Sequence, residues 1–190
     1  SDMDECGVCG GDGSTCGLQS QINSADCGET IIVTEDYDFP LVIHKCIRLE
    51  ADSNLRARPR LRRGTDIDFN ERNNNDDCNC DYVQIDGIAF ENNDDSGTGS
   101  YTLTVNNPSG SLDLTITDSE FNGQDDDRGI WFKNSPSSGV YNISNSFFVN
   151  ASSYYMTQSF TNNLSSSTNF NFSYNYFDQA ESDGECALAC

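Results

Sequence analysis

Four stretches of the chain share one pattern of apolar and polar positions. Each has eight residues, with apolar side chains at positions 1 and 3, polar ones at positions 2 and 4, a turn-prone centre and phenylalanine at position 8. The stretches are 83–90, 114–121, 141–148 and 170–177, which lie 31, 27 and 29 residues apart. Alternation over positions 1–4 has the period of a β-strand, so positions 1 and 3 face the same side. The pattern therefore predicts a repeated strand, and 47–49 resembles a degenerate earlier copy.

Further short strands are expected between the copies, at 101–105, 129–132 and 154–160. Gly, Asn, Asp and Ser fill the connections. From residue 28 onward, no apolar stripe with a period of 3.6 residues continues for three turns, so the pattern predicts no helix there. Several strands in each repeat of about 30 residues are typical of a solenoid.

The predicted fold class is all-β, a parallel β-helix of about five to six coils. The alternative is an antiparallel β-sandwich, which also has short strands and polar turns. The constant position 8 separates the two folds, because equivalent residues of a solenoid stack about 4.8 Å apart. We therefore expect Phe90, Phe121, Phe148 and Phe177 to form one internal aromatic column.

Residues 1–27 differ in composition from the rest. They contain four cysteines, many glycines and almost no large apolar side chain. Such a segment cannot bury a core of its own and needs covalent cross-links. We interpret residues 1–27 as a disulfide-rich N-terminal cap and 28–190 as the β-helix domain. The initial C-x-x-C could also bind zinc, but no second pair follows at metal-binding spacing.

Cysteines and glycosylation motifs together indicate a secreted protein. The odd number of cysteines leaves at least one free or bonded to another chain. The nine cysteines are Cys6, Cys9, Cys16, Cys27, Cys46, Cys78, Cys80, Cys186 and Cys190. The four N-x-S motifs, which predict N-glycans, begin at Asn142, Asn150, Asn163 and Asn171.

The net charge of the chain limits the classes of partner that it can bind. The chain carries 31 acidic and 10 basic residues, a formal charge of −21. A surface this acidic repels nucleic acids and anionic membranes, and no apolar run approaches the roughly 18–20 residues that span a bilayer. We therefore expect no nucleic-acid partner, no membrane insertion and an extracellular or cell-surface location. The start at Ser1 suggests a piece of a longer secreted precursor.

Residues 4–16 read DECGVCGGDGSTC. This segment resembles the C-G-V-C-G-G-D-G-S-x-C module of large secreted proteins, including thrombospondin-repeat metalloproteases and surface proteins of protists, algae and bacteria. The resemblance implies an extracellular, multidomain parent protein. It implies no catalysis, because the module is a structural spacer in those proteins.

Residues 28–50, with a Gly-x-Thr-Ile strand, a tyrosine and two further short strands, are similar to the opening coils of the pectin-lyase-like superfamily. The resemblance extends loosely over 28–180 and implies a right-handed β-helix. Enzymes of that superfamily degrade acidic polysaccharides, with aspartate-bound calcium and a basic residue, or with several aspartates and a Gly-His-Gly segment. Here the single histidine, His44, lies in an apolar run without flanking glycines. We therefore expect a wall residue at this position.

Five arginines lie within eight residues. They are Arg56, Arg58, Arg60, Arg62 and Arg63. Apolar residues alternate with the first four, which predicts a strand whose arginine face neutralises nearby carboxylates. Two alternatives remain open, a docking surface for an acidic neighbour and a furin-type cleavage site at 60–63.

Acidic pairs follow two of the repeats at the same offsets. They are Asp94 and Asp95 after Phe90, and Asp125 and Asp126 after Phe121. Stacked on neighbouring coils, these carboxylates would repel one another unless a cation lay between them, and calcium suits oxygen ligands outside the cell. The sequence favours solvated turns over this site. No cofactor is required, and calcium is the ion to test.

No residue pattern selects a catalytic site, so we expect a structural, non-enzymatic module of an extracellular glycoprotein. It would self-associate or contact neighbouring domains, as in a surface filament such as a protist or algal flagellar hair. The first alternative is a carbohydrate-binding or adhesive module that uses exposed aromatics such as Trp131, Tyr154 and Tyr155. The second is a polysaccharide lyase or hydrolase.

Overall fold

The computed structural model describes residues 17–69, 81–91, 101–106, 111–123, 128–133, 138–150, 156–158, 168–178 and 188–189. Within them the chain is β-structure with one short helix. Every pair of neighbouring strands is parallel. The chain is therefore an all-β, parallel-sheet protein, and the antiparallel sandwich is excluded.

The strands of the described residues form three sheets, which we number 1 to 3. Sheet 1 contains β1 (Thr30–Val33), β3 (Arg48–Ala51), β6 (Tyr82–Asp86), β9 (Asp113–Thr117), β12 (Gly139–Ser144) and β15 (Thr168–Ser173). Sheet 2 contains β4 (Arg60–Arg62), β7 (Ala89–Glu91), β10 (Glu120–Asn122), β13 (Phe147–Val149) and β16 (Tyr176–Phe177). Sheet 3 contains β2 (Leu41–Ile43), β5 (Thr65–Asp68), β8 (Tyr101–Asn106), β11 (Arg128–Phe132), β14 (Met156–Gln158) and β17 (Leu188–Ala189).

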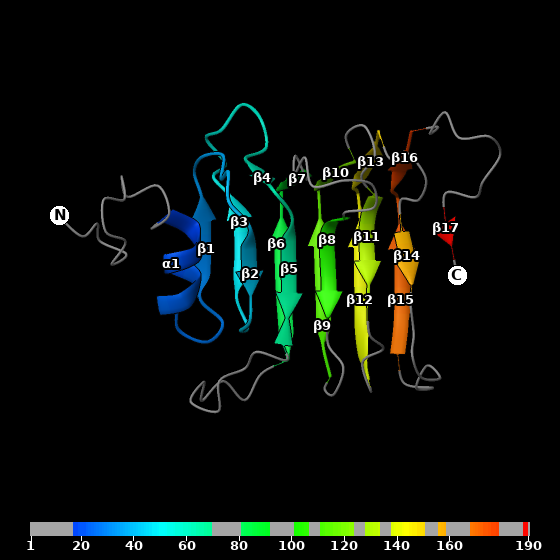
Figure 1. Cartoon of the computed structure of the whole chain (residues 1–190), viewed down its shortest axis with the longest axis horizontal. Coiled ribbons are helices and arrows are strands. Elements are labelled where there is room, and N and C mark those ends of the chain that lie inside the picture. The colour runs from blue at the N-terminus through cyan, green and yellow to red at the C-terminus, as the bar shows by residue number, and fades with distance from the viewer. Residues whose placement is uncertain are drawn as a thin grey trace.

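From β3 onward, consecutive strands belong to sheets 1, 2 and 3 in turn. Three successive strands, such as β6, β7 and β8, therefore form one tier. The incomplete first tier has β1 and β2, and Tyr37, bridged to Leu61, takes the place of a sheet 2 strand. Successive tiers lie side by side along the long axis of the molecule, from blue to red in Figure 1.

The repeat found in the sequence sets the register of sheet 1. Position 1 of neighbouring copies is paired, as in Val83 with Leu114 and Leu114 with Tyr141. The degenerate copy is confirmed, because Leu49 pairs with Ile85. Positions 1 and 3 are buried in the copies at 83, 114 and 141. In the last copy the side chain of Phe172 remains 40% exposed, because no further tier covers it in the described chain.

Position 8 forms the expected aromatic column in sheet 2. Ring centroids are 5.1 Å apart for Phe90 and Phe121, 4.7 Å for Phe121 and Phe148, and 4.7 Å for Phe148 and Phe177. Interplanar angles of 7°, 15° and 14° show that the rings are stacked. The first three rings are completely buried. The constant phenylalanine is thus explained by parallel, in-register strands.

The corner between sheets 1 and 2 explains the centre of the repeat. Position 5 has positive φ in every copy, with values of 72° at Gly87, 48° at Asp118, 51° at Asn145 and 57° at Tyr174. Glycine, aspartate and asparagine tolerate this left-handed conformation, which turns the chain sharply. Tyrosine is the unusual residue in this series.

Position 6 supplies a ladder of polar side chains at the same corner. The Ser119 hydroxyl accepts from the Ile88 N–H at 3.3 Å and donates to the Thr117 carbonyl at 2.8 Å. Ser146 repeats both bonds one tier later, with the Ser119 N–H and the Ser144 carbonyl. These serines are buried, so the ladder satisfies backbone groups that water cannot reach.

A helix covers the N-terminal end of the tiers. Helix α1 (Gly17–Ser24) lies beside β1 in Figure 1 and contacts both β1 and β2. Its Leu18 and Ile22 are buried in the same hydrophobic cluster as the strands. The sequence pattern predicted no element at residues 17–24, because the absence of helix signals was inferred for the chain from residue 28 onward. Only two apolar residues anchor α1, so it shows no long stripe.

A single cluster of buried side chains runs between the three sheets, with members from β1, β4, β11 and the strands between them. Within the described ranges, the only helix is far too short to be considered as a membrane span.

Candidate functional site

The last tier has an unusual composition. Residues 168–178, which form β15 and β16, contain five aromatic side chains and one charged residue, Asp178. This contrasts with the strongly acidic chain as a whole. We call residues 168–178 the tail surface. Depletion of charge and enrichment in Tyr and Phe are typical of the centre of a protein–protein interface.

Apolar side chains are exposed at this end of the molecule. Tyr174 is 90% exposed, Tyr176 55% and Phe172 40%, and Phe147 of the preceding tier is 40% exposed. Only two other large apolar side chains among the described residues are exposed. Exposed apolar groups gathered in one region indicate a contact surface.

The tail surface also presents a strand edge. In the part of the chain that the structure describes, β15 pairs with β12 on one side and ends sheet 1 on the other. Proteins commonly protect such edges with charged residues or proline. The sequence of β15, TNFNFS, has neither. Within the described residues, β15 therefore lacks both of these protections.

The opposite end, which we call the head, is closed by α1. The side-chain amide of Gln19 accepts from the Val42 N–H at 2.8 Å and donates to the Val42 carbonyl at 2.9 Å, as a neighbouring strand would. The ammonium of Lys45 donates to the carbonyls of Asn23 and Ala25 at the C-terminal end of α1, at 2.8 and 3.2 Å. Cationic donors suit these carbonyls, so Lys45 holds the helix in place.

The predicted glycosylation motifs are only partly described. Asn142 and Asn171 are paired in register on the outward side of sheet 1, and the side-chain amide nitrogen of Asn171 donates to the side-chain oxygen Oδ1 of Asn142 at 2.8 Å. Asn150 is exposed, directly follows β13 and has φ of 57°. Asn163 lies outside the described residues. The side chains of Asn142 and Asn171 thus lie on the same face of sheet 1, on adjacent tiers.

The arginine run forms ion pairs with carboxylates, as expected. The strand that carries them, β4, is shorter than the run and covers only Arg60–Arg62. Arg62 contacts Asp36 at 2.6 Å and Asp38 at 3.1 Å. Both Arg62 and Arg60 reach the buried carboxylate of Glu91, at 3.5 and 3.4 Å. Partial burial lowers the pKa of Arg62, but the carboxylates outweigh it and raise the pKa above its ordinary value. These arginines bind the 36–38 segment to sheet 2.

Arg58 extends this face towards the tail. Its guanidinium lies 3.9 Å from the Glu120 carboxylate and 5.2 Å from the centroid of the Phe147 ring. It also donates to the Asp118 carbonyl at 2.6 Å. Arg58, Arg60 and Arg62 therefore have partners within the chain, whereas Arg56 and Arg63 are exposed.

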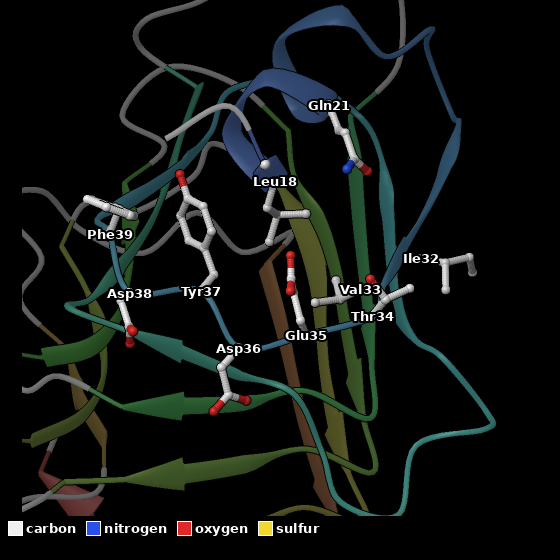
Figure 2. A pocket seen from close by; sticks show the side chains of 11 residues that line it. Leu18, Gln21, Ile32, Val33, Thr34, Glu35, Asp36, Tyr37, Asp38 and Phe39 are labelled. Carbon is white, nitrogen blue, oxygen red and sulfur yellow. The ribbon is translucent and has the colours of Figure 1, made fainter. Parts of the chain in front are cut away.

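A pocket of about 230 Å³ lies between α1 and the 32–39 segment. Figure 2 shows Leu18, Tyr37 and Glu35 around it, with the Glu35 carboxylate directed towards Leu18. Asp36 and Asp38 point away from the helix, towards the arginine face. Glu35 has no partner among the described residues. The pocket thus combines an apolar wall with one carboxylate, a composition that suits a cation with an apolar stem.

A shallow hollow of about 400 Å³ lies on the outward side of sheet 1. Its carboxylates are Glu50 and Asp86, which are paired in register on β3 and β6. The Thr117 hydroxyl donates to Asp86. The sequence did not select this pair, because Glu50 precedes the clear repeats and the pairing depends on the register of a degenerate copy. Two neighbouring carboxylates can serve acid–base chemistry on a sugar.

Two buried tyrosines have altered ionisation. Burial raises the pKa of Tyr37, against a hydrogen bond with the Gln19 backbone that lowers it. Burial also raises the pKa of Tyr141, and the charge of Asp113 adds to the effect. Both phenols are neutral at physiological pH, and both belong to the hydrophobic cluster.

Several predicted sites fall outside the described residues. These are the acidic turns Asp94, Asp95, Asp125 and Asp126, the aromatics Tyr154 and Tyr155, and Cys6, Cys9, Cys16, Cys78, Cys80, Cys186 and Cys190. Cys27 and Cys46 are each disulfide-bonded. His44 is half-buried directly after β2, and Trp131 stacks on Tyr101 at 4.9 Å. Among the described residues, no group of three or more His, Cys, Asp or Glu is placed to hold a metal ion.

Comparison with known proteins identified no family. No protein-family model matches the chain, and no curated protein matches it significantly.

Proposed function

We propose that the chain is a structural, non-enzymatic module of an extracellular glycoprotein, in which the three sheets close into a right-handed parallel β-helix that self-associates at its tail. A surface filament or appendage is the form of assembly that we propose for the parent protein. In this proposal residues 1–27, which include α1, are the disulfide-rich N-terminal cap.

The tail surface is the observation that carries this proposal. Aromatic side chains stand at the end of a continuous core, next to a strand edge that bears no charge or proline. Burying such side chains removes apolar area from water and contributes roughly 25 cal/mol per Å². Edge strands of this kind are templates for another chain. The charges of Arg60 and Arg62, by contrast, are already neutralised by carboxylates of the same chain.

Sedimentation velocity of the oxidised, secreted full chain tests self-association. We expect oligomers whose fraction rises with protein concentration. The variant Phe172→Asp should shift the chain to monomers, because it places a charge on the tail. Ile32→Asp is the matched control, since Ile32 is 46% exposed but lies in the first tier. A wild-type chain that remains monomeric at every concentration contradicts the proposal.

Intact-glycopeptide mass spectrometry of native material tests the secretory part of the proposal. We expect glycans at Asn142 and Asn171, whose amides lie on the outward side of sheet 1. Bare asparagines at all four motifs would remove this support. A non-reducing gel of the same material shows whether cysteines outside the described residues join neighbouring chains covalently, as a ladder that collapses with reductant.

The hollow on sheet 1 supports a second candidate, a carbohydrate-binding or carbohydrate-cleaving module. Its support is the in-register pair Glu50 and Asp86 beside Gln84 and Thr115. Activity on pectate, alginate and neutral polysaccharides, with Glu50→Gln as the control, distinguishes this candidate. Loss of a measured activity in Glu50→Gln would favour an enzyme over the structural module.

A further inference from the structure

We infer that the pocket between α1 and the 32–39 segment binds a primary ammonium group on a short alkyl stem, such as a lysine side chain or a free alkylamine. The pocket lies at the head of the molecule, so this site does not depend on self-association at the tail. The size of the pocket, its apolar walls and its single inward carboxylate together define this class of ligand.

The volume of the pocket limits the ligand to a small group. At about 230 Å³, the pocket is smaller than the roughly 300–1,000 Å³ of sites that enclose a drug-sized molecule or a cofactor. A single side chain or a short alkylamine is the size of ligand that remains.

The walls of the pocket are apolar and are held in place by contacts within the chain. Leu18 and Val33 belong to the buried hydrophobic cluster. The Tyr37 ring packs edge-on against Phe39 at 5.7 Å, and the Tyr37 hydroxyl is hydrogen-bonded to the Gln19 backbone. These walls are therefore ordered before an alkyl stem contacts them, which lowers the entropic cost of binding.

The polar group of the pocket is the Glu35 carboxylate, which Figure 2 shows directed towards Leu18. Within the described chain, Glu35 makes no hydrogen bond or ion pair. The first turn of α1, which borders the pocket at Gly17, favours a negative charge there but does not bond to this carboxylate. The Glu35 oxygens are therefore available to a ligand that donates hydrogen bonds and carries a positive charge.

The neighbouring acids favour an organic cation over a metal ion. Asp36 and Asp38 point away from the pocket and pair with Arg62. Calcium takes about six to eight oxygen ligands, and in the part of the chain that the structure describes no group of three or more His, Cys, Asp or Glu is placed to hold a metal. An ammonium group needs only a charge-assisted hydrogen bond to Glu35, while its stem covers the apolar wall.

Saturation-transfer difference NMR on the oxidised full chain tests the site, with n-butylammonium as the probe. The signal is measured on the ligand, so weak binding is detected without labelling the protein. We expect saturable binding of n-butylammonium. The uncharged stem of n-butanol and the stemless charge of methylammonium should each bind several-fold more weakly, because the pocket contacts both parts of the ligand.

Two variants with the same change in net charge locate the binding. Glu35→Gln keeps the shape of the side chain and removes its charge, so the affinity for n-butylammonium should fall about fivefold. Asp38→Asn is the matched control and should leave this affinity unchanged, because Asp38 is directed towards Arg62. Equal losses in the two variants would overturn the inference, since net charge and not the pocket would then attract the cation. Absence of binding to wild type, or equal binding of n-butanol, would also overturn it.

A blocked Gly-Gly-Lys-Gly-Gly peptide distinguishes the two sources of the ligand, with norleucine in place of lysine as its control. Binding that depends on lysine and on Glu35 assigns the pocket to a lysine side chain of a partner chain. Binding of n-butylammonium alone assigns it to free amines. Sedimentation velocity of Glu35→Gln should match that of wild type, so failure of this site and failure of the proposed self-association are separate results.

Discussion

Two buried threonines on neighbouring strands differ in a single hydrogen bond. The Thr102 hydroxyl donates to the Gly129 carbonyl at 3.0 Å. The Thr65 hydroxyl has no hydrogen-bond partner in the described structure, and Thr65 lies in register between Leu41 and Leu103. A buried hydroxyl without a partner costs about 1–3 kcal/mol, whereas an isosteric apolar group does not.

Thr65→Val should therefore stabilise the fold by about 1 kcal/mol, and Thr102→Val should destabilise it by a similar amount. The two substitutions are chemically identical, so the difference isolates the hydrogen bond. Urea unfolding at equilibrium measures both free energies. Shifts of the same sign in the two variants would contradict this account.

Tyr174 is the least suitable residue at its position in the repeat. It has φ of 57° and is 90% exposed, so the side chain gains little from packing. A left-handed conformation costs an ordinary L-residue about 1–2 kcal/mol, and asparagine tolerates it better. Tyr174→Asn should raise the free energy of unfolding by roughly 0.5–1 kcal/mol. The reverse change at the equivalent position, Asn145→Tyr, should lower it in the same urea measurement.

At the scale of elements, the head depends on a helix held by side-chain contacts. Gln19 makes two hydrogen bonds to Val42, whereas Gln21 is an exposed residue of the same helix. Gln19→Ala leaves both backbone groups of Val42 without this partner and should cost about 1–3 kcal/mol. Gln21→Ala should change stability by less than about 0.5 kcal/mol. Thermal and urea unfolding compare the two variants, and equal losses would show that Gln19 does not close the edge.

Helix α1 could not be predicted from the sequence, in contrast to the strands of the repeat. The strands of the repeat were predictable, because parallel in-register stacking forces the same residue type onto the same position, as the Phe90–Phe121–Phe148 column demonstrates. The cap occurs once, so no repetition marks it. Its two buried residues, Leu18 and Ile22, make too short a stripe to distinguish a helix from a loop.

The candidate site was predictable to a smaller extent for a related reason. The arginine face was visible as alternation, although its partners Asp36, Asp38 and Glu91 were not, because they come from other tiers. The tail surface could have been found from its composition, five aromatics and one charge in eleven residues. The exposure of the tail surface could not have been predicted. Phe172 occupies position 3 of the repeat, as does its buried neighbour Ile143, so the sequence pattern places both side chains inward.

At the scale of the whole molecule, net charge and the tail surface act in opposite directions. Two chains of charge −21 repel one another, while the proposed contact contains one carboxylate from each copy, Asp178. Salt shortens the range of the repulsion from about 30 Å at 0.01 M to about 3 Å at 1 M and leaves apolar burial in place. Self-association should therefore become several-fold tighter as sodium chloride is raised over this range.

The opposite salt dependence would indicate a different contact. If the arginine face around Arg60 and Arg62 docked onto an acidic neighbour, salt would screen the attraction and weaken association. Sedimentation equilibrium across a sodium chloride series measures the dissociation constant directly. Phe172→Asp is the control for non-specific salting-out, and it should remain monomeric at every salt concentration because it lacks the tail contact. Tighter association of wild type, with monomers of this variant, would place the contact at the charge-poor end of the molecule, where exposed aromatic side chains lie.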